Sequence, residues 1–180
     1  MSKESEAKAL FGTLCNALDD MQWTYNKDEE NLVLETAATG DSFTIRLRVR
    51  INADRQVMYL KSPLPFNVKE DTRELLTKAI CYANYQILNG SFEYDQSDGY
   101  VAFKVVVPFM NSLIGKAVCN YMIIMSCKMM DTFAEPLLLL TNKEIDYDEF
   151  CKRIDKIFNG TTQETTESAQ QEETTDLPQE

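Results

Sequence analysis

The sequence contains no histidine among its 180 residues. Without an imidazole to take the proton, neither a Ser-His-Asp triad nor a Cys-His nucleophile pair can form. The commonest transition-metal ligand is missing as well. We therefore expect no catalytic residues of these kinds, no metal site and no cofactor. A hydrolase that uses carboxylates alone stays open, because pairs of acids carry no spacing signature.

Cysteine motifs and long hydrophobic runs are also absent. The five cysteines are scattered and include no CxxC pair, so we expect them to be reduced and to pack as small apolar side chains. The N-terminal MSKESEAKALF has no hydrophobic signal core. The longest uncharged run in the most apolar segment, Ala117–Cys127, is shorter than the ~20 residues that cross a bilayer. We expect a soluble, cytoplasmic protein without a membrane partner.

Positive charge is scarce, because 18 Lys and Arg residues stand against 29 Asp and Glu residues, for a net charge of −11. The last twenty residues, Thr161–Glu180, hold six acids and no base, and the rest of the chain carries −5. This balance argues against a nucleic-acid partner, which needs a surplus of Lys and Arg. The composition predicts one folded domain over 1–159, followed by a disordered acidic tail over 160–180.

Two pairs of acids, Asp95/Asp98 and Asp146/Asp148, raise the question of calcium binding. Their spacing is not that of an EF-hand loop, so we interpret them as turn and cap residues. Asp146 and Glu149 have the spacing of a capping box, which predicts that a last helix begins there.

Hydrophobic periodicity divides the folded part into helices and strands. The predicted order is a helix over 3–21, strands over 31–37, 43–51 and 56–61, a helix over 70–88, strands over 91–94 and 100–107, a helix over 112–133 and the last helix. Strands joined only by turns must run antiparallel. We expect an α+β fold with a single antiparallel β-sheet and helices packed on one of its faces.

The stretch from Ala79 to Val107 carries the clearest pattern, a helix that ends near Gly90 and passes into a β-hairpin. Together with the order of elements, it resembles the YbjN family of bacterial proteins, whose fold is similar to that of type III secretion chaperones. The matching residues are Asn84, Gly90, Phe92, Asp95, Asp98-Gly99 and the strand Val101–Val107. We expect Gly90 to cap the helix and Asn84 to hydrogen-bond the backbone of the neighbouring strand.

The resemblance implies a bacterial protein linked to sensory or stress regulation, with no catalytic residues. The chaperones of similar fold act as homodimers that hold extended segments of client proteins. We therefore expect a non-enzymatic protein-interaction domain, regulatory or chaperone-like, that forms a homodimer and binds a protein or peptide client. The alternative is a small-ligand sensor or an acid-dependent enzyme, with its site between sheet and helices.

Three arginines, Arg46, Arg48 and Arg50, share one face of the strand over 43–51. Lys61 or Lys104 joins this line if their strands are neighbours. The planar guanidinium suits carboxylates, so the line is a candidate surface for an acidic peptide, which includes the protein's own tail. The alternative is a solvated face balanced by acids across the strands, and polar outward residues are normal for a one-sided sheet.

The helix over 112–133 is apolar on nearly all sides. One stripe holds Ile114, Val118, Tyr121, Met122, Met125 and Met129, and the other side holds Cys119, Ile123, Cys127 and Met130. One stripe can serve the core, and the second then needs a cover. Either the last helix and the Leu137–Leu140 run provide it, or the second stripe contacts another copy of the chain or another partner.

Overall fold

The computed structural model describes residues 2–158. Its elements are α1 (Lys3–Asp20), β1 (Tyr25–Asp28), β2 (Val33–Thr39), β3 (Thr44–Asn52), β4 (Val57–Pro63), the 3-10 turn η1 (Glu70–Thr72), α2 (Arg73–Gln86), β5 (Ser91–Asp95), β6 (Tyr100–Pro108) and α3 (Lys116–Thr141). A last described helix covers 147–158. The tail predicted over 160–180 lies outside the described residues.

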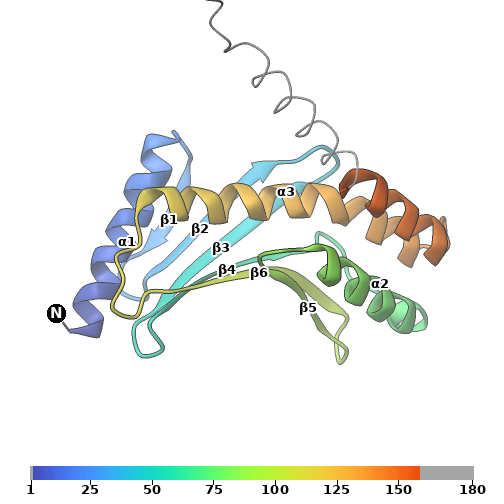
Figure 1. Ribbon diagram of the computed structural model, residues 1–180, viewed down its shortest axis with the longest axis horizontal. Helices are drawn as coiled ribbons and strands as arrows, with labels where there is room; N and C mark the ends of the chain where they lie inside the picture. Colours follow the sequence, from blue (N-terminus) through green and yellow to red (C-terminus); the bar gives the residue numbers. More distant parts are fainter. Residues whose placement is uncertain (1, 159–180) are drawn as a thin grey trace, which may run out of the picture.

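All six strands form one sheet in the order β1-β2-β3-β4-β6-β5, and every neighbouring pair is antiparallel. The helices lie on one side of this sheet. Helix α3 crosses it, with α1 at one end of α3 and α2 towards the other (Figure 1). The predicted α+β class with a single antiparallel sheet is therefore confirmed. Within residues 2–158, no helix combines the length and the hydropathy that crossing a bilayer requires.

Strand β3 shows the alternation that the sequence predicts. Its inward residues Ile45, Leu47, Val49 and Ile51 are all buried, and the arginines between them are exposed. Because successive side chains of a strand point to opposite faces, this pattern places all three guanidinium groups on the side of the sheet away from the helices. The hydrophobic core lies between sheet and helices, where the rings of Phe92, Phe103 and Phe133 meet at centroid distances of 5.2 and 5.3 Å.

Two elements differ from the sequence prediction. Strand β1 forms the edge of the sheet beside β2, and its residues have almost no buried side chains, so they carry no hydrophobic alternation to detect. Helix α3 runs through Pro136 to Thr141, so the Leu137–Leu140 run belongs to it rather than to a separate segment. A proline inside a helix costs one backbone hydrogen bond. Burial of Leu137 and Leu140 offsets this cost.

Gly90 is not the cap of the preceding helix. Helix α2 already ends at Gln86, and Ile87 is extended. Gly90 instead has φ +93°, and a Cβ there would lie 2.5 Å from Cζ of Phe103 and 2.9 Å from the carbonyl oxygen of Lys104. A glycine is needed at this position because the chain enters β5 with a left-handed turn pressed against β6.

The expectation that the second stripe of α3 contacts another copy of the chain or another partner also requires a correction. Cys119, Ile123 and Met130 are buried, and Cys127 is half-buried. The cover comes from the chain itself, because α3 packs on the sheet and is flanked by α1 and α2. Phe158 of the last helix adds to it through a ring contact with Phe133. These four residues therefore form no exposed contact surface on the single chain.

Candidate binding face of the sheet

The open face of the sheet carries a hollow with a volume of about 790 Å³. We call it the arginine trough. Its lining comes from β3, from β4 beside it, from β2 and the edge strand β1 on the other side, and from the start of β6. The polar and aromatic side chains that line it include Glu35, Arg46, Arg48, Arg50, Tyr59, Lys61 and Tyr100.

The three arginines form the axis of the trough. Alternate residues of a strand lie about 6.6 Å apart on one face, so Arg46, Arg48 and Arg50 span roughly 13 Å. The strand register places Arg48 opposite Lys61 and Arg50 opposite Tyr59. The three arginines therefore follow one another along β3, an inner strand of the sheet.

The arginines differ in how their charges are balanced. Nε of Arg48 lies 3.4 Å from Oε1 of Glu35, and both side chains are more than half exposed, so this ion pair is weak. The side chains of Arg46 and Arg50 make no hydrogen bond or ion pair with any of residues 2–158. The trough thus presents two guanidinium forks whose donors are free to bind an external carboxylate.

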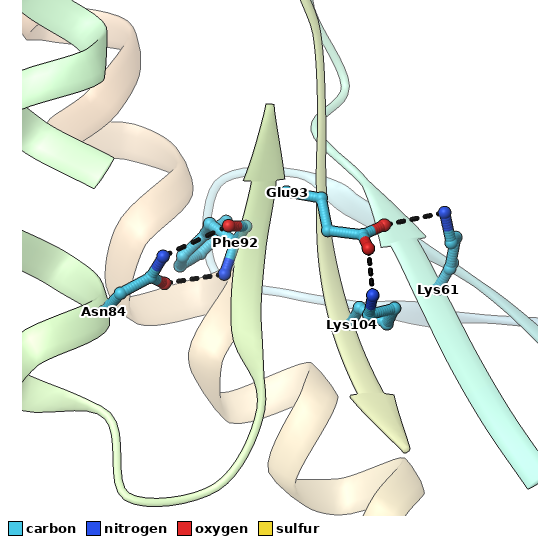
Figure 2. Close-up of polar contacts among 5 residues, drawn as sticks. All are labelled: Lys61, Asn84, Phe92, Glu93 and Lys104. Carbon is cyan, nitrogen blue, oxygen red and sulfur yellow. Dashed lines mark hydrogen bonds and ion pairs between the residues drawn. The ribbon is translucent and has the colours of Figure 1, made fainter. Parts of the chain in front are cut away.

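Lys104 lies on the same face, but it is already ion-paired with Glu93. Glu93 of β5 bridges Lys104 and Lys61, with Nζ of Lys61 at 2.7 Å from Oε2 and Nζ of Lys104 bonded to Oε1 (Figure 2). Burial raises the pKa of the Glu93 carboxyl, but the hydrogen bonds and charges of the two lysines outweigh this effect, so the pKa lies below its usual value. The predicted Arg46, Arg48 and Arg50 are brought together, and Lys104 is placed beside them as part of a neutralised cluster.

Sequence reasoning did not identify Tyr59 and Tyr100, which line the trough beside its cations. Tyr59 packs beside Arg50, and Tyr100, 39% exposed, lines the trough near Pro63. The sequence did contain a signal. Tyr59 lies two residues before Lys61, and Tyr100 lies four residues before Lys104, so each tyrosine shares a face of its strand with that lysine. Aromatic rings on such a face add apolar contact area for a bound chain.

Three of the four acids in these pairs serve the turns and caps expected of them. Oδ1 of Asp95 accepts from the backbone N–H and the hydroxyl of Ser97, and Oδ1 of Asp98 accepts from the N–H of Tyr100. Oδ1 of Asp146 accepts from the N–H of Glu149 at 2.8 Å and caps the last helix. Within residues 2–158, no three Cys, Asp or Glu side chains converge as metal ligands.

No family model matches this sequence, and no curated protein matches it. Two solved structures share its fold. YbjN from E. coli, described as a putative transcription regulator, superposes with a TM-score of 0.51 at 10% identity, over 74% of this chain and 92% of its own. A chain of the HopA1–SchA chaperone–effector complex does so with a TM-score of 0.53 at 11% identity, over 73% of this chain and 97% of its own. The fold is YbjN-like and similar to that of a type III effector chaperone, as the sequence resemblance implies.

Proposed function

We propose that this chain is a non-enzymatic protein-binding domain, regulatory or chaperone-like, that holds an extended acidic segment of a partner protein in the arginine trough. The observation that carries the proposal is the pair of arginines, Arg46 and Arg50, that stand on one line of the trough without a partner among residues 2–158. The likeness to a chain from a chaperone–effector complex supports binding of a protein rather than another class of molecule.

An extended peptide matches the spacing of the arginines. Its side chains alternate with the same period as those of β3, so a carboxylate at every second residue meets Arg46, Arg48 and Arg50 in turn. Exposed ion pairs contribute only about 0.2–1 kcal/mol each. Several contacts are therefore needed, and Tyr59 and Tyr100 supply apolar area beside the charges.

The lining of the trough supports binding rather than acid–base chemistry. It holds four cations and a single carboxylate, Glu35, which is ion-paired with Arg48. Hydrolysis that relies on carboxylates alone, as in glycosidases, uses a pair of such groups in different environments. The space between sheet and helices, where the alternative site was expected, is filled by the apolar core.

A homodimer in the cytoplasm belongs to the same proposal. The outer side of α3 supports it, because Tyr121 and Ile124 are 47% and 56% exposed there. Light scattering should give twice the 20.6 kDa mass of one chain. Replacing Ile124→Lys should halve the measured mass, and a mass of one chain for the unaltered protein would refute the dimer.

The partner-binding proposal is tested with a fluorescein-labelled peptide of alternating Glu and Thr, as long as β3 at 9 residues. Its affinity is measured by fluorescence anisotropy at low salt. The double variant Arg46→Gln/Arg50→Gln should bind it about tenfold more weakly, which corresponds to about 1.4 kcal/mol. Arg55→Gln, in the exposed β3–β4 turn, is the matched control and should bind like the unaltered chain. Equal loss in both variants, or no binding at all, would refute the proposal.

A further inference from the structure

We infer that the acidic C-terminal segment of this chain, Thr161–Glu180, binds in the arginine trough of its own molecule and competes there with the partner. The inference rests on the proposed function, since the segment and the partner use the same site. It adds a form of regulation, in which the free protein occupies its own binding face and only a segment with better contacts displaces it.

Charge complementarity selects the trough as the place for this segment. The segment holds six acids and no base, and the rest of the chain carries −5, so most of the folded surface repels it. The trough attracts the segment instead, because its lining holds four cations and one carboxylate. Two of those cations, Arg46 and Arg50, have no partner among residues 2–158, so an incoming carboxylate replaces no internal ion pair.

The described chain ends beside the turn that leads into the trough. The ring of Phe158 lies 6.0 Å from that of Phe133 on α3. In the same part of α3, Asp131 accepts a hydrogen bond from the N–H of Asp41 at 3.0 Å, and Glu135 accepts one from the hydroxyl of Ser42 at 2.8 Å. Both residues belong to the turn between β2 and β3. Since a helix with its side chains is about 10–12 Å across, the backbone at Phe158 lies within roughly 20 Å of that turn.

The length of the remaining chain fits the path over the turn. The 22 residues of 159–180 span up to about 75 Å when extended. Glu164 and Glu167 follow Phe158 by six and nine residues, and so reach about 20 and 30 Å. Arg46 follows Ser42 by four residues, about 13 Å along the strand. The path from Phe158 over the turn to Arg46 is therefore at most about 33 Å, which the acids from Glu172 onward can cover. The acids beyond Glu167 then have enough chain to pass along the ~13 Å from Arg46 to Arg50.

Tethering makes a weak contact effective. A segment joined to its site by a short linker acts at a local concentration in the millimolar range. At a local concentration of about 2–9 mM, a complex with a dissociation constant near 1 mM is mostly formed, and it weakens an external competitor by about threefold to tenfold. Because the contacts are exposed ion pairs, the effect should vanish at high salt.

The test compares the full chain with a full-length variant in which all six acids of the segment are replaced by their amides. These replacements are E164Q, E167Q, E172Q, E173Q, D176N and E180Q. The probe is the nine-residue Glu–Thr peptide used for the proposed function. The amide variant should bind it about threefold to tenfold more tightly at low salt, and the two chains should become equal at about 0.5 M salt.

A second readout needs no ligand. The side-chain Nε–Hε resonances of Arg46 and Arg50 in a ¹⁵N spectrum should differ between the full chain and its amide variant, because a carboxylate bonded to a guanidinium shifts them. The competing cations of the last helix are Lys152 and Lys156, which are exposed, whereas Arg153 is already ion-paired with Glu149. Replacing Lys152→Gln/Lys156→Gln should leave the difference in probe affinity intact, whereas Arg46→Gln/Arg50→Gln should abolish it.

The outcomes separate the two proposals. Unchanged arginine resonances with equal probe affinity in the full chain and the amide variant would overturn the self-binding inference and leave the proposed function standing. Failure of the probe to bind either chain would overturn the proposed function, and the arginine resonances would then decide the self-binding inference alone. A difference that disappears in the Lys152→Gln/Lys156→Gln variant would place the segment on the last helix and overturn the inference.

Discussion

The side-chain amide of Asn84 on α2 makes two hydrogen bonds with the backbone of Phe92 on β5. The N–H of Phe92 donates to Oδ1 at 2.7 Å, and Nδ2 donates to the carbonyl oxygen of Phe92 at 3.1 Å (Figure 2). The amide thus provides the donor and acceptor that a further strand would provide. Because β5 is an edge of the sheet, this contact satisfies backbone groups that would otherwise be open to pairing with another chain.

Replacing Asn84→Ala should lower the free energy of unfolding by about 2–3 kcal/mol, because two half-buried backbone groups lose their partners. Urea denaturation measures the change. Asn84→Asp keeps an acceptor but loses the donor, so its free energy of unfolding should lie between those of the unaltered chain and Asn84→Ala. Asn26→Ala, on the exposed edge strand β1, is the matched control and should change stability by less than about 0.5 kcal/mol. Equal effects at Asn84 and Asn26 would contradict this account.

Two glycines should respond to alanine in opposite directions. Gly90→Ala should destabilise the fold by about 2 kcal/mol or more, because φ is +93° and the new Cβ would meet Phe103 and Lys104. Gly12→Ala, exposed on α1 with no atom within 4 Å of its Cβ position, should stabilise the fold by about 0.5–1 kcal/mol. Thermal denaturation of both variants checks the pair, and a stabilising Gly90→Ala would show that the entry into β5 is described wrongly.

The cluster of Glu93 with Lys61 and Lys104 predicts a dependence on pH. Since the pKa of Glu93 is lowered in the folded state, the carboxylate stabilises the fold above the usual Glu value near 4.5, and this stability is lost as the pH falls through the lower folded-state value. Glu93→Gln should cost about 1 kcal/mol at neutral pH, because solvent screens side chains that are about a third exposed. Denaturation curves should show the unaltered chain and the variant converging at acid pH, and a constant difference down to low pH would count against the cluster.

Adjacent positions on α3 test how the helix is covered. Ile123 is fully buried, whereas Ile124 is 56% exposed. Ile123→Ala should lower the free energy of unfolding by about 2–5 kcal/mol through the lost burial and the cavity it leaves. Ile124→Ala should lower it by less than about 1 kcal/mol under the same conditions. The reverse order would mean that the stripe with Cys119 and Ile123 is not the one the chain covers.

The sequence was sufficient for the arginine line but not for the full trough. Alternation along β3 predicted that Arg46, Arg48 and Arg50 share an open face, because a strand has a fixed period of two. Lys104 meets Lys61 only because β6 lies between β4 and β5, and such an order depends on distant packing that local patterns do not encode. Periodicity likewise predicted that α3 has two apolar sides. It did not predict that the fold itself covers them, because that cover also depends on distant packing.

The edges of elements were the least predictable part. Strand β1 pairs with β2 through its backbone, and its exposed side chains leave no mark in the sequence. The extension of α3 beyond Pro136 depends on the burial of Leu137 and Leu140, which outweighs the local tendency of a proline to end a helix.

The most direct test of the central claim is a ¹⁵N titration of the full chain with the nine-residue Glu–Thr peptide. We predict saturable shifts of the Arg46 and Arg50 side-chain resonances and of backbone amides in β3 and β4, while the amides around Ile124 on the outer side of α3 stay in place. Shifts confined to the helical side, or none on the open face of the sheet, would contradict the account.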